Sequence, residues 1–306
     1  MNIWTEKYRP KEVDDYVFQN PEQKEQVNKW ITEGKVPHLL FSGSPGTGKT
    51  TLAKLLIRQL GVQDHDLLEI NASRERGIDT IRKTIVNFSS TMPFGDFKII
   101  LMDEADYLTP EAQASMRGVM EEYAETARFI LTCNYPNKII PALHSRCQGF
   151  HINNLDHTEF TARIATILVT ESIEFDLDVL DTFVKATYPD LRKCLNSVQQ
   201  SIANNKLLEP SASNAGSHDY RLDAVELFKH GKTREARKLI CSQARADEMD
   251  EFFRWCYDNL SLFSKTEQGQ DRAITIIKNA LVSHSQVSDF EINIAAMLVE
   301  LSQIGE

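Results

Sequence analysis

The residues best suited to chemistry in this 306-residue chain lie in the segment GSPGTGKT, which runs from Gly43 to Thr50. The segment matches the pattern G-x-x-x-x-G-K-[ST] and separates a short apolar run from a stretch with helical apolar spacing. Its glycines allow backbone N–H groups to surround phosphate oxygens, and the following helix adds its N-terminal donors. Lys49 supplies positive charge to the β- and γ-phosphates of ATP, and Thr50 offers a hydroxyl to Mg²⁺. The residues expected to hold the nucleotide are Ser44, Pro45, Gly46, Thr47, Gly48, Lys49, Thr50 and Thr51.

Two acids, Asp103 and Glu104, follow the apolar run at residues 98–102. Open α/β sheets bind their ligands at the carboxyl ends of the strands, which is where these acids are expected. Asp103 is suited to the outer shell of Mg²⁺, and Glu104 can polarise a water molecule for attack on the γ-phosphate. The alternative is an acidic helix cap, because acids also favour the start of a helix. In a chain with a phosphate-binding loop, the catalytic interpretation is favoured.

Two further polar residues follow apolar runs, and each has an ordinary structural explanation. Asn134 ends the segment FILTCN, where its amide can orient the attacking water or contact the γ-phosphate; considered alone, it would be a turn residue. Arg146, in the segment HSRCQGF, would by itself be a surface arginine at the end of a loop.

A helix is expected to begin at Pro110, with Thr109 as its N-cap. Its apolar stripe is best explained by core packing and consists of Ala112, Met116 and Met120. Gln113 and Arg117 are four positions apart and are expected to share a face of this helix. We interpret this pair as a coupling between a DNA or neighbour contact and Glu104.

Short apolar strands alternate with helices over the first half of the chain, which predicts a parallel sheet covered by helices on both faces. The expected strands are HLLFS (38–42), DLLEI (66–70), KIILM (98–102), RFILTC (128–133) and GFHI (149–152). From about residue 153 the pattern is helical, without convincing strands. The segment at 208–219, rich in Ser, Asn, Ala, Gly and Pro, is the best candidate for a linker. We therefore expect an α/β P-loop domain at 1–152, a helical lid at 153–212 and an all-α C-terminal domain at 213–306.

Composition narrows the class of protein. The chain is 42% apolar and 25% charged, as in ordinary globular proteins, and no stretch approaches the roughly 20 apolar residues of a membrane span. Five widely spaced cysteines indicate reduced thiols and a cytoplasmic location rather than a zinc module. The net charge of −10 argues against a uniformly basic DNA-binding surface, so any DNA contact must be concentrated on one face.

Six segments resemble, in order and approximate spacing, those of the clamp-loader AAA+ ATPases. They are WTEKYRP, HLLFSGSPGTGKTT, EINASRERGIDTIR, IILMDEADYLT, FILTCN and HSRCQGF. The chain is similar to the small subunits of replication factor C and to the equivalent ATPase subunit of T4-like phages. Small departures, among them NASRERG and YPDLRK, look more phage-like, which would place the protein in the cytoplasm of a phage host.

The resemblance implies roles for two arginines. In that family each ATP site lies between neighbouring subunits of an open ring, and the arginine of the Ser-Arg-Cys motif reaches the γ-phosphate of the adjacent subunit. Arg146 would then act in trans as an arginine finger. Arg192, in YPDLRK, corresponds to the lid arginine that contacts the nucleotide of its own subunit; without the resemblance it would be a solvated helix residue.

The resemblance also implies where the partners bind. The DNA backbone would follow the segment NASRERGIDTIRKT, with Arg76, Ile78, Arg82 and Lys83 as candidate contacts. The adenine side would be formed by Tyr8, Arg9, Pro10 and Val17. Phe94, in the segment that touches the sliding clamp, is either an exposed contact or tucked beneath the sheet.

The predicted function is that of an ATPase subunit of a sliding-clamp loader. Copies of the chain would join a companion subunit in a pentameric open ring, which opens a clamp with bound ATP and releases it on primer–template DNA after hydrolysis. Two alternatives remain: another AAA+ DNA motor such as a branch-migration helicase, and a nucleotide-binding ring subunit that does not hydrolyse ATP.

Overall fold

The computed structural model describes residues 3–74, 78–153, 155–209, 220–243, 249–284, 286–287 and 289–304. Contacts within the chain define two compact units: residues 1–163 with 189–192, and residues 164–188 with 193–306. The expected division into three domains stays a prediction, and its second boundary lies outside the described residues.

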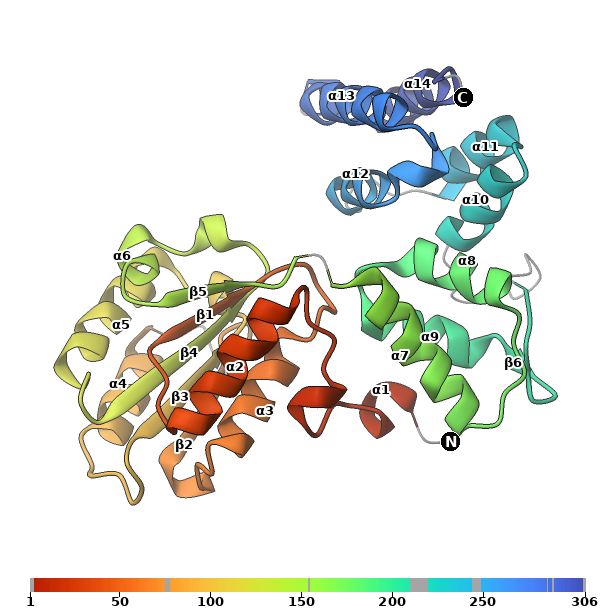
Figure 1. The fold of residues 1–306 in the computed structure, drawn as a ribbon. Helices are drawn as coiled ribbons and strands as arrows, with labels where there is room; N and C mark the ends of the chain where they lie inside the picture. The colour runs from red at the N-terminus through yellow and green to blue at the C-terminus, as the bar shows by residue number, and fades with distance from the viewer. Residues whose placement is uncertain are drawn as a thin grey trace. The chain divides into compact units, whose positions relative to one another are not determined.

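The first unit contains an α/β arrangement (Figure 1). Its strands are β1 (Leu39–Ser42), β2 (Leu67–Asn71), β3 (Lys98–Asp103), β4 (Ala127–Cys133) and β5 (Gln148–His151). Its helices are α1 (Trp4–Lys7), α2 (Pro21–Glu33), α3 (Lys49–Gln59), α4 (Ile78–Ser89), α5 (Pro110–Glu122) and α6 (Pro141–His144), and α7 (His157–Thr170) begins in this unit. All five expected strands are present, shifted by at most one residue at either end.

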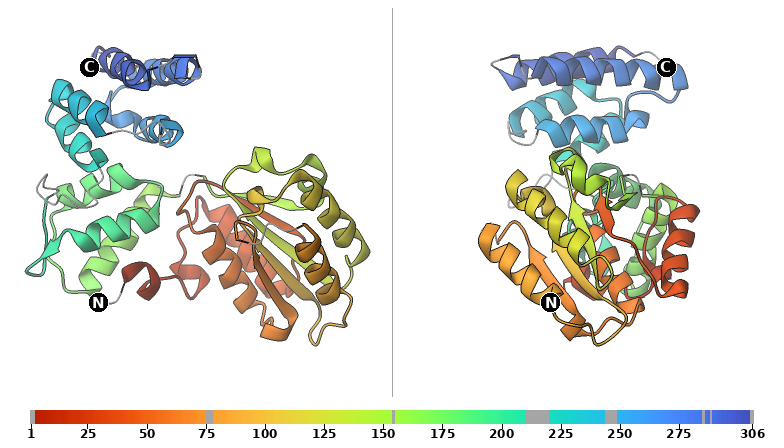
Figure 2. Two further views of the ribbon diagram at one scale, coloured as in Figure 1. Left: turned by 180° about the vertical axis from the view of Figure 1, so that it is seen from behind. Right: turned by 90° about the vertical axis from the view of Figure 1, so that its left-hand side faces the viewer.

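The five strands form one parallel sheet in the order β2-β3-β4-β1-β5. Helices α2 and α3 pack on one face, and α4 and α5 pack on the other (Figures 1 and 2). Ser42 at the end of β1 is opposite Cys133 of β4, and Asp103 of β3 is opposite Asn71 of β2. The register therefore brings the carboxyl ends of the strands to one edge, where ligands of such sheets bind.

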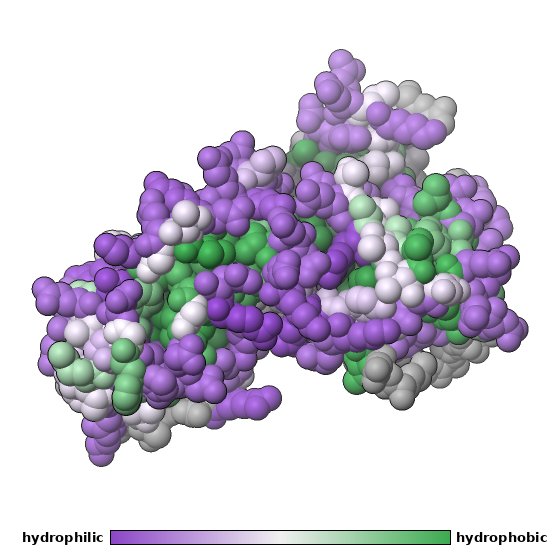
Figure 3. Space-filling model, turned by 60° about the horizontal axis from the view of Figure 1, so that its bottom comes forward, coloured by the Kyte–Doolittle hydropathy of each residue, from purple (hydrophilic) through white to green (hydrophobic). Residues whose placement is uncertain are grey.

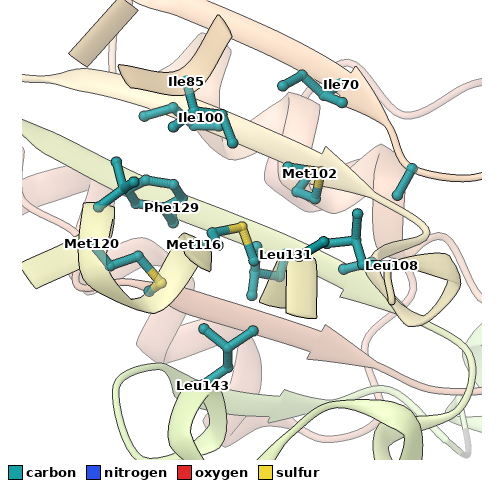
Figure 4. Packing of buried hydrophobic residues seen from close by; sticks show 14 of the residues in the cluster. Ile70, Ile85, Ile100, Met102, Leu108, Met116, Met120, Phe129, Leu131 and Leu143 are labelled. Atoms are coloured by element: carbon teal, nitrogen blue, oxygen red, sulfur yellow. The ribbon is translucent and has the colours of Figure 1, made fainter. Parts of the chain in front are cut away.

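The core between the sheet and α5 confirms the predicted apolar stripe. Met116 and Met120 of α5 are buried and lie beside Phe129 and Leu131 of β4 (Figure 4). Burying side chains of this size stabilises a fold by about 1.5–3 kcal/mol each. The helix begins as expected, because the Thr109 hydroxyl accepts a hydrogen bond from the backbone N–H of Ala112. The core thus fixes the start of α5 shortly after Asp103 and Glu104.

The second unit is mainly helical (Figure 1). Its helices are the end of α7, α8 (Leu177–Thr187), α9 (Leu191–Gln200, from residue 193), α10 (Tyr220–Lys229), α11 (Thr233–Gln243), α12 (Met249–Asp258), α13 (Glu267–His284) and α14 (Phe290–Ser302). Trp255 of α12 donates its indole N–H to the carbonyl of Lys185 in α8, at 2.9 Å. Helices from the expected lid and from the expected C-terminal domain therefore pack together in one unit.

The expectation of an entirely helical second half was wrong in one place. Strands β6 (Ile202–Ala203) and β7 (Lys206–Leu207) form an antiparallel hairpin. Asn204 and Asn205 connect them with φ values of 51° and 58°, a conformation that asparagine tolerates in two-residue hairpin turns. Two-residue strands are too short to show an alternating pattern, so the pair of asparagines was the available signal. The expected linker at 208–219 lies outside the described residues from 210 onward.

The described part of the chain also bears on the expectations for membrane spans, the polarity of the surface and the state of the thiols. No helix there is long and apolar enough to span a membrane. Figure 3 shows hydrophilic residues over most of the face that it presents, with apolar residues gathered in a few patches. All five cysteines are described and carry free thiols, as expected from their spacing.

Candidate nucleotide-binding and hydrolysis site

A pocket at the carboxyl edge of the sheet gathers most of the residues that were predicted to bind or hydrolyse ATP. It is lined by Pro45, Gly46, Gly48, Lys49, Thr50, Thr51, Asp103, Glu104, Thr132, Cys133, Asn134 and Arg192. The lining comes from the loop between β1 and α3, from the ends of β3 and β4, and from the start of α9. These residues all belong to the first unit. The arrangement places a phosphate-binding loop, two acids, an amide and an arginine around one space.

Tyr16 contacts the phosphate-binding loop on its buried side. It was not among the site residues predicted from the sequence. Its hydroxyl donates to the carbonyl of Thr47 at 3.0 Å, and its ring packs against Gly48, which has φ +87°. Burial raises the pKa of the Tyr16 hydroxyl, so it remains a donor at neutral pH. Tyr16 lies in the segment YVFQN, beside the predicted Val17, and its aromatic type was the only sequence signal.

Lys49 is almost fully buried at the start of α3. Its ammonium group donates to the carbonyls of Gly43 at 2.9 Å and Ser44 at 2.7 Å. Burial lowers its pKa to about 8, although negative charge on Cys133, Asp106, Asp103 and Asp190 acts in the opposite direction. Because burial also raises the pKa of the Cys133 thiol to about 12, the carboxylates provide that compensation at neutral pH. The lysine is thus charged at pH 7 and aimed at the loop.

Asp103 joins the loop to the central strands. One of its oxygens, Oδ1, accepts hydrogen bonds from the hydroxyls of Thr50 at 2.7 Å and Thr132 at 2.6 Å. The Thr132 hydroxyl in turn accepts the backbone N–H of Glu104 at 3.0 Å. Hydroxyl and carboxylate oxygens are the donors that Mg²⁺ prefers, so the donor set fits this ion. Within the described ranges no group of three or more His, Cys, Asp or Glu residues could hold a metal ion.

Glu104 has an unusual backbone conformation, with φ 56° and ψ 43°. A residue with a Cβ atom in this left-handed region costs roughly 1–2 kcal/mol, and such conformations cluster at functional sites. The tight turn directs the chain from β3 into the following 3₁₀ helix (Ala105–Tyr107) and leaves the Glu104 side chain at the pocket. Glu104 occupies the N-cap position of this 3₁₀ helix, but its side chain makes no cap hydrogen bond. The alternative of an acidic helix cap is therefore not supported.

Arg192 lines the pocket from the first turn of α9. Asp190, two residues earlier, lies against the loop: a Cβ atom on Gly46, which has φ +72°, would be 1.8 Å from the Asp190 carboxylate. Gly46 is therefore required both by its backbone angle and by this close approach. Asp190 was not predicted, and its proximity links the segment YPDLRK to the phosphate-binding loop.

The predicted adenine-side segment is not part of the pocket lining. Tyr8 is half-buried, and its carbonyl accepts a hydrogen bond from Arg163 at 3.2 Å. Arg9 is exposed and pairs with Glu6 at 2.7 Å, Pro10 is half-buried, and Val17 is buried. The role of this segment stays a prediction.

Arg146 lies outside the pocket, just after α6. Its guanidinium donates to the carbonyl of Ala142 at 2.8 Å and forms an ion pair with Glu121, at the end of α5. No acid neighbours Arg146 in the sequence, so this pairing comes from the fold. The side chain of Arg146 is 30% exposed, and that of Glu121 is 50% exposed. The guanidinium is thus held at the surface, away from the ATP site of its own chain.

Gln113 and Arg117 both belong to α5, but they differ in exposure, and their coupling role stays a prediction. Gln113 is buried, whereas Arg117 is exposed. The Gln113 amide donates to the carbonyls of Leu108 at 3.2 Å and Lys138 at 3.0 Å, and accepts the N–H of Ile140 at 2.8 Å. The segment at 138–140 covers the N-terminal part of α5, and helical spacing alone could not reveal that cover.

Phe94 is 82% exposed, which excludes the alternative that it lies beneath the sheet. The neighbouring Met92 is 81% exposed. The buried carboxylate of Asp66 holds the backbone of this loop. It accepts the N–H of Phe94 at 3.1 Å (Oδ1) and 3.0 Å (Oδ2), and the N–H of Gly95 at 2.8 Å (Oδ2). The fold therefore presents two apolar side chains on an anchored loop.

The predicted DNA contacts are only partly described. Lys83 is exposed on α4. Arg76 lies outside the described residues, and the side chains of Ile78 and Arg82 do too, although their backbone belongs to α4.

Comparison with known proteins agrees with this geometry. A sequence model of the ATPase family associated with various cellular activities (AAA) matches residues 39–154, which include the whole pocket except Arg192. The class is therefore an AAA-type P-loop ATPase.

The relatives define the family within that class. The chain is 43% identical to the replication factor C small subunit of Saccharolobus solfataricus, over 99% of this chain and 87% of that protein. It is 34% identical to replication factor C small subunit 1 of Pyrobaculum islandicum, over 99% of this chain and 95% of that protein. For the Methanocella arvoryzae small subunit, 43% identity covers 65% of this chain and 63% of that protein. The chain belongs to the family of replication factor C small subunits, which are clamp-loader ATPases.

The branch-migration alternative is supported only at the level of fold. The solved structure of the Thermotoga maritima RuvB Holliday junction branch migration motor aligns with a TM-score of 0.55. The alignment covers 72% of this chain and 79% of that chain, at 14% identity. This likeness confirms the AAA+ architecture and does not extend to function.

Proposed function

We propose that the chain acts in DNA replication, where it uses ATP binding to load a sliding clamp onto primer–template DNA and ATP hydrolysis to release it. The observation that carries this proposal is the match to replication factor C small subunits along 99% of the chain. The match extends past the ATPase domain into the helices that follow it. A protein that shared only the P-loop fold would not be expected to align there.

Within one chain, the proposed division of work follows the pocket. Lys49 and the backbone N–H groups of the loop bind the β- and γ-phosphates, and Thr50 and Asp103 hold Mg²⁺. When bound, Mg²⁺ would neutralise charge on the phosphates. Glu104 takes the proton of the attacking water, and Asn134 orients that water or the γ-phosphate. Arg192 contacts the phosphates from the first turn of α9, and Tyr8, Arg9, Pro10 and Val17 form the adenine side.

Arg146 completes the site of a neighbouring chain in this proposal. Its guanidinium lies outside its own pocket and is held near the surface by Glu121 and the Ala142 carbonyl. An exposed ion pair contributes only about 0–1 kcal/mol, so a phosphate can take over the guanidinium at little cost. The assembly that we propose is a pentameric open ring made of copies of this chain and a companion subunit, working in the cytoplasm.

The partner contacts are proposed from the resemblance to clamp loaders and, for Phe94 and Lys83, from their exposure. Phe94 is offered to the sliding clamp by its anchored loop, and Arg76, Ile78, Arg82 and Lys83 follow the DNA backbone without reading sequence. Gln113 and Arg117 would transmit such a contact to Glu104. The buried Gln113 ties α5 to the segment at 138–140, which supports a role in transmission rather than direct contact.

The test is the ATPase rate of the chain assembled with its companion subunit, measured with and without primer–template DNA and a sliding clamp. We expect DNA and clamp together to stimulate hydrolysis strongly, because both complete the sites in the proposed ring. The same complex made with Lys49→Ala subunits controls for contaminating ATPases. A high rate that neither DNA nor clamp changes would contradict the proposal.

A further inference from the structure

Asp106 belongs to the 3₁₀ helix that follows β3, and its side chain contacts the backbone just beyond the end of β4. It is the last acid of the segment DEAD at 103–106, and its side chain is buried. Its Oδ2 atom accepts hydrogen bonds from the backbone N–H groups of Asn134 at 3.2 Å and Tyr135 at 3.1 Å. These two residues directly follow β4. The carboxylate therefore fixes the backbone that carries the Asn134 side chain into the pocket.

The second oxygen of the same carboxylate makes this residue costly to bury. Asp106 Oδ1 is buried and has no hydrogen-bond partner among the described residues. A buried polar atom without a partner costs roughly 1–3 kcal/mol, and more when it is charged. A neutral side chain that accepted the same two N–H groups would avoid much of this cost. Such exceptions call for an explanation, and a role in the neighbouring site is one.

We propose that Asp106 is a positioning residue of the ATPase site and acts through Asn134. By holding two consecutive N–H groups, it sets the direction in which the Asn134 side chain faces the γ-phosphate. The inference rests on the proposed role of Asn134 in hydrolysis. Asp106 itself does not line the pocket, so its proposed effect on hydrolysis is exerted through other residues.

The charge of Asp106 has a separate effect, which the experiment must hold constant. It favours the charged form of Lys49, together with the carboxylates of Asp103 and Asp190. Asp106→Asn and Asp106→Ala both remove this charge, whereas only Asp106→Ala removes the acceptor of the two hydrogen bonds. A difference between these two variants therefore reports on positioning.

Asp66 offers a matched control outside the nucleotide site. It is also a buried carboxylate, and it also accepts the N–H groups of two consecutive residues, Phe94 and Gly95. Asp66→Ala removes the same kind of contact from the same unit. In an assay without the clamp, it should change stability without changing hydrolysis.

The experiment measures ATP affinity and kcat of the assembled loader with primer–template DNA and without clamp. We expect Asp106→Ala to lower kcat about tenfold, equivalent to about 1.4 kcal/mol, with a smaller change in ATP affinity. Asp106→Asn should stay within about threefold of the wild-type kcat, because its amide oxygen still accepts both N–H groups. In the Asn134→Ala background, Asp106→Ala should cause little further loss, since both act on one interaction. If Asp106→Ala does not fold, Asp106→Ser, whose short hydroxyl cannot reach both groups, replaces it.

The outcomes separate the two claims. If Asn134→Ala keeps the wild-type kcat, the proposed role of Asn134 is wrong, and the inference falls with it. If Asn134→Ala lowers kcat but Asp106→Ala does not, only the inference is overturned. It is also overturned if the two losses add, if Asp106→Asn is as impaired as Asp106→Ala, or if Asp66→Ala loses kcat equally.

Discussion

The nucleotide side and the Arg146 side of the first unit are built in different ways. At the nucleotide side Lys49 is buried, and Asp103 and Thr132 are joined by short hydrogen bonds to groups from other parts of the chain. Arg146 is held by one surface carboxylate and one carbonyl, and part of its side chain stays exposed. The groups proposed to act on the chain's own nucleotide are thus fixed by the fold. The group proposed to act on a neighbour is left able to change partner.

Arg146→Ala is expected to have the largest effect, and it tests whether the Arg146 side acts on a neighbouring chain. We expect hydrolysis by the assembled loader to fall by about 10³–10⁵-fold, the range typical of arginine fingers. ATP affinity of the isolated subunit should not change, because Arg146 lies outside its own pocket. Arg146→Lys, which keeps charge but not the planar fork, should recover only part of the rate. An equal loss in the isolated subunit would show that Arg146 acts in its own chain.

Glu104→Gln tests the fixed side of the comparison. We expect kcat to fall by about 10²–10⁴-fold, because an amide cannot accept the proton of the attacking water. ATP binding should persist, since the phosphate-binding loop is untouched. Glu111→Gln, an exposed acid in the first turn of α5, is the matched control and should keep the wild-type kcat. Loss of ATP affinity in Glu104→Gln would instead point to a role in binding.

The pH dependence of ATP binding sharpens the description of Lys49. Burial lowers the pKa of Lys49 to about 8, from 10.5 for a free lysine. Below this pH the ammonium is already charged; above it, binding must take up a proton, because the phosphates favour the charged form. Affinity should therefore fall by up to about tenfold per pH unit above about pH 8. Titration with a fluorescent ATP analogue at several pH values measures this fall in affinity. As the control, Lys49→Met should bind ATP weakly, with an affinity that does not change over this pH range.

Tyr16→Phe should have the smallest effect. The change removes the hydroxyl that donates to the Thr47 carbonyl and leaves the packing against Gly48 intact. A lost buried hydrogen bond costs roughly 1–3 kcal/mol, part of which appears in stability, so ATP affinity should weaken about three- to tenfold. Tyr257→Phe, at an exposed tyrosine of the second unit, is the control. Unchanged affinity would mean that the loop keeps its shape without Tyr16.

Local patterns were sufficient to predict the sheet and most of the pocket lining. The phosphate-binding loop is contiguous, and Asp103, Glu104 and Asn134 each follow a recognisable apolar strand. Because parallel strands end at one edge, their chemistry could be combined before the fold was known. The resemblance to clamp loaders added Arg192, which the structure places in the same pocket.

The contacts that could not be predicted join residues far apart in sequence. Tyr16 and Thr47 are separated by 31 positions, Asp106 and Asn134 by 28, and Glu121 and Arg146 by 25. None of these pairs leaves a periodic pattern. The burial of Gln113 could not be predicted for a related reason, since it depends on a segment that arrives from beyond β4. The hairpin of β6 and β7 was missed because its strands are two residues long.

The left-handed backbone of Glu104 limits how this position can evolve. Glycine adopts φ 56° freely, and asparagine and aspartate adopt it more readily than most residues, whereas β-branched residues are disfavoured there. A duplicated copy of this gene that gave up hydrolysis but kept its fold should therefore drift toward Gly, Asn or Asp at position 104. Val, Ile and Thr should be rare. Loss of the acid at position 104 would report lost hydrolysis, whereas the residue types that replace it would report the left-handed backbone.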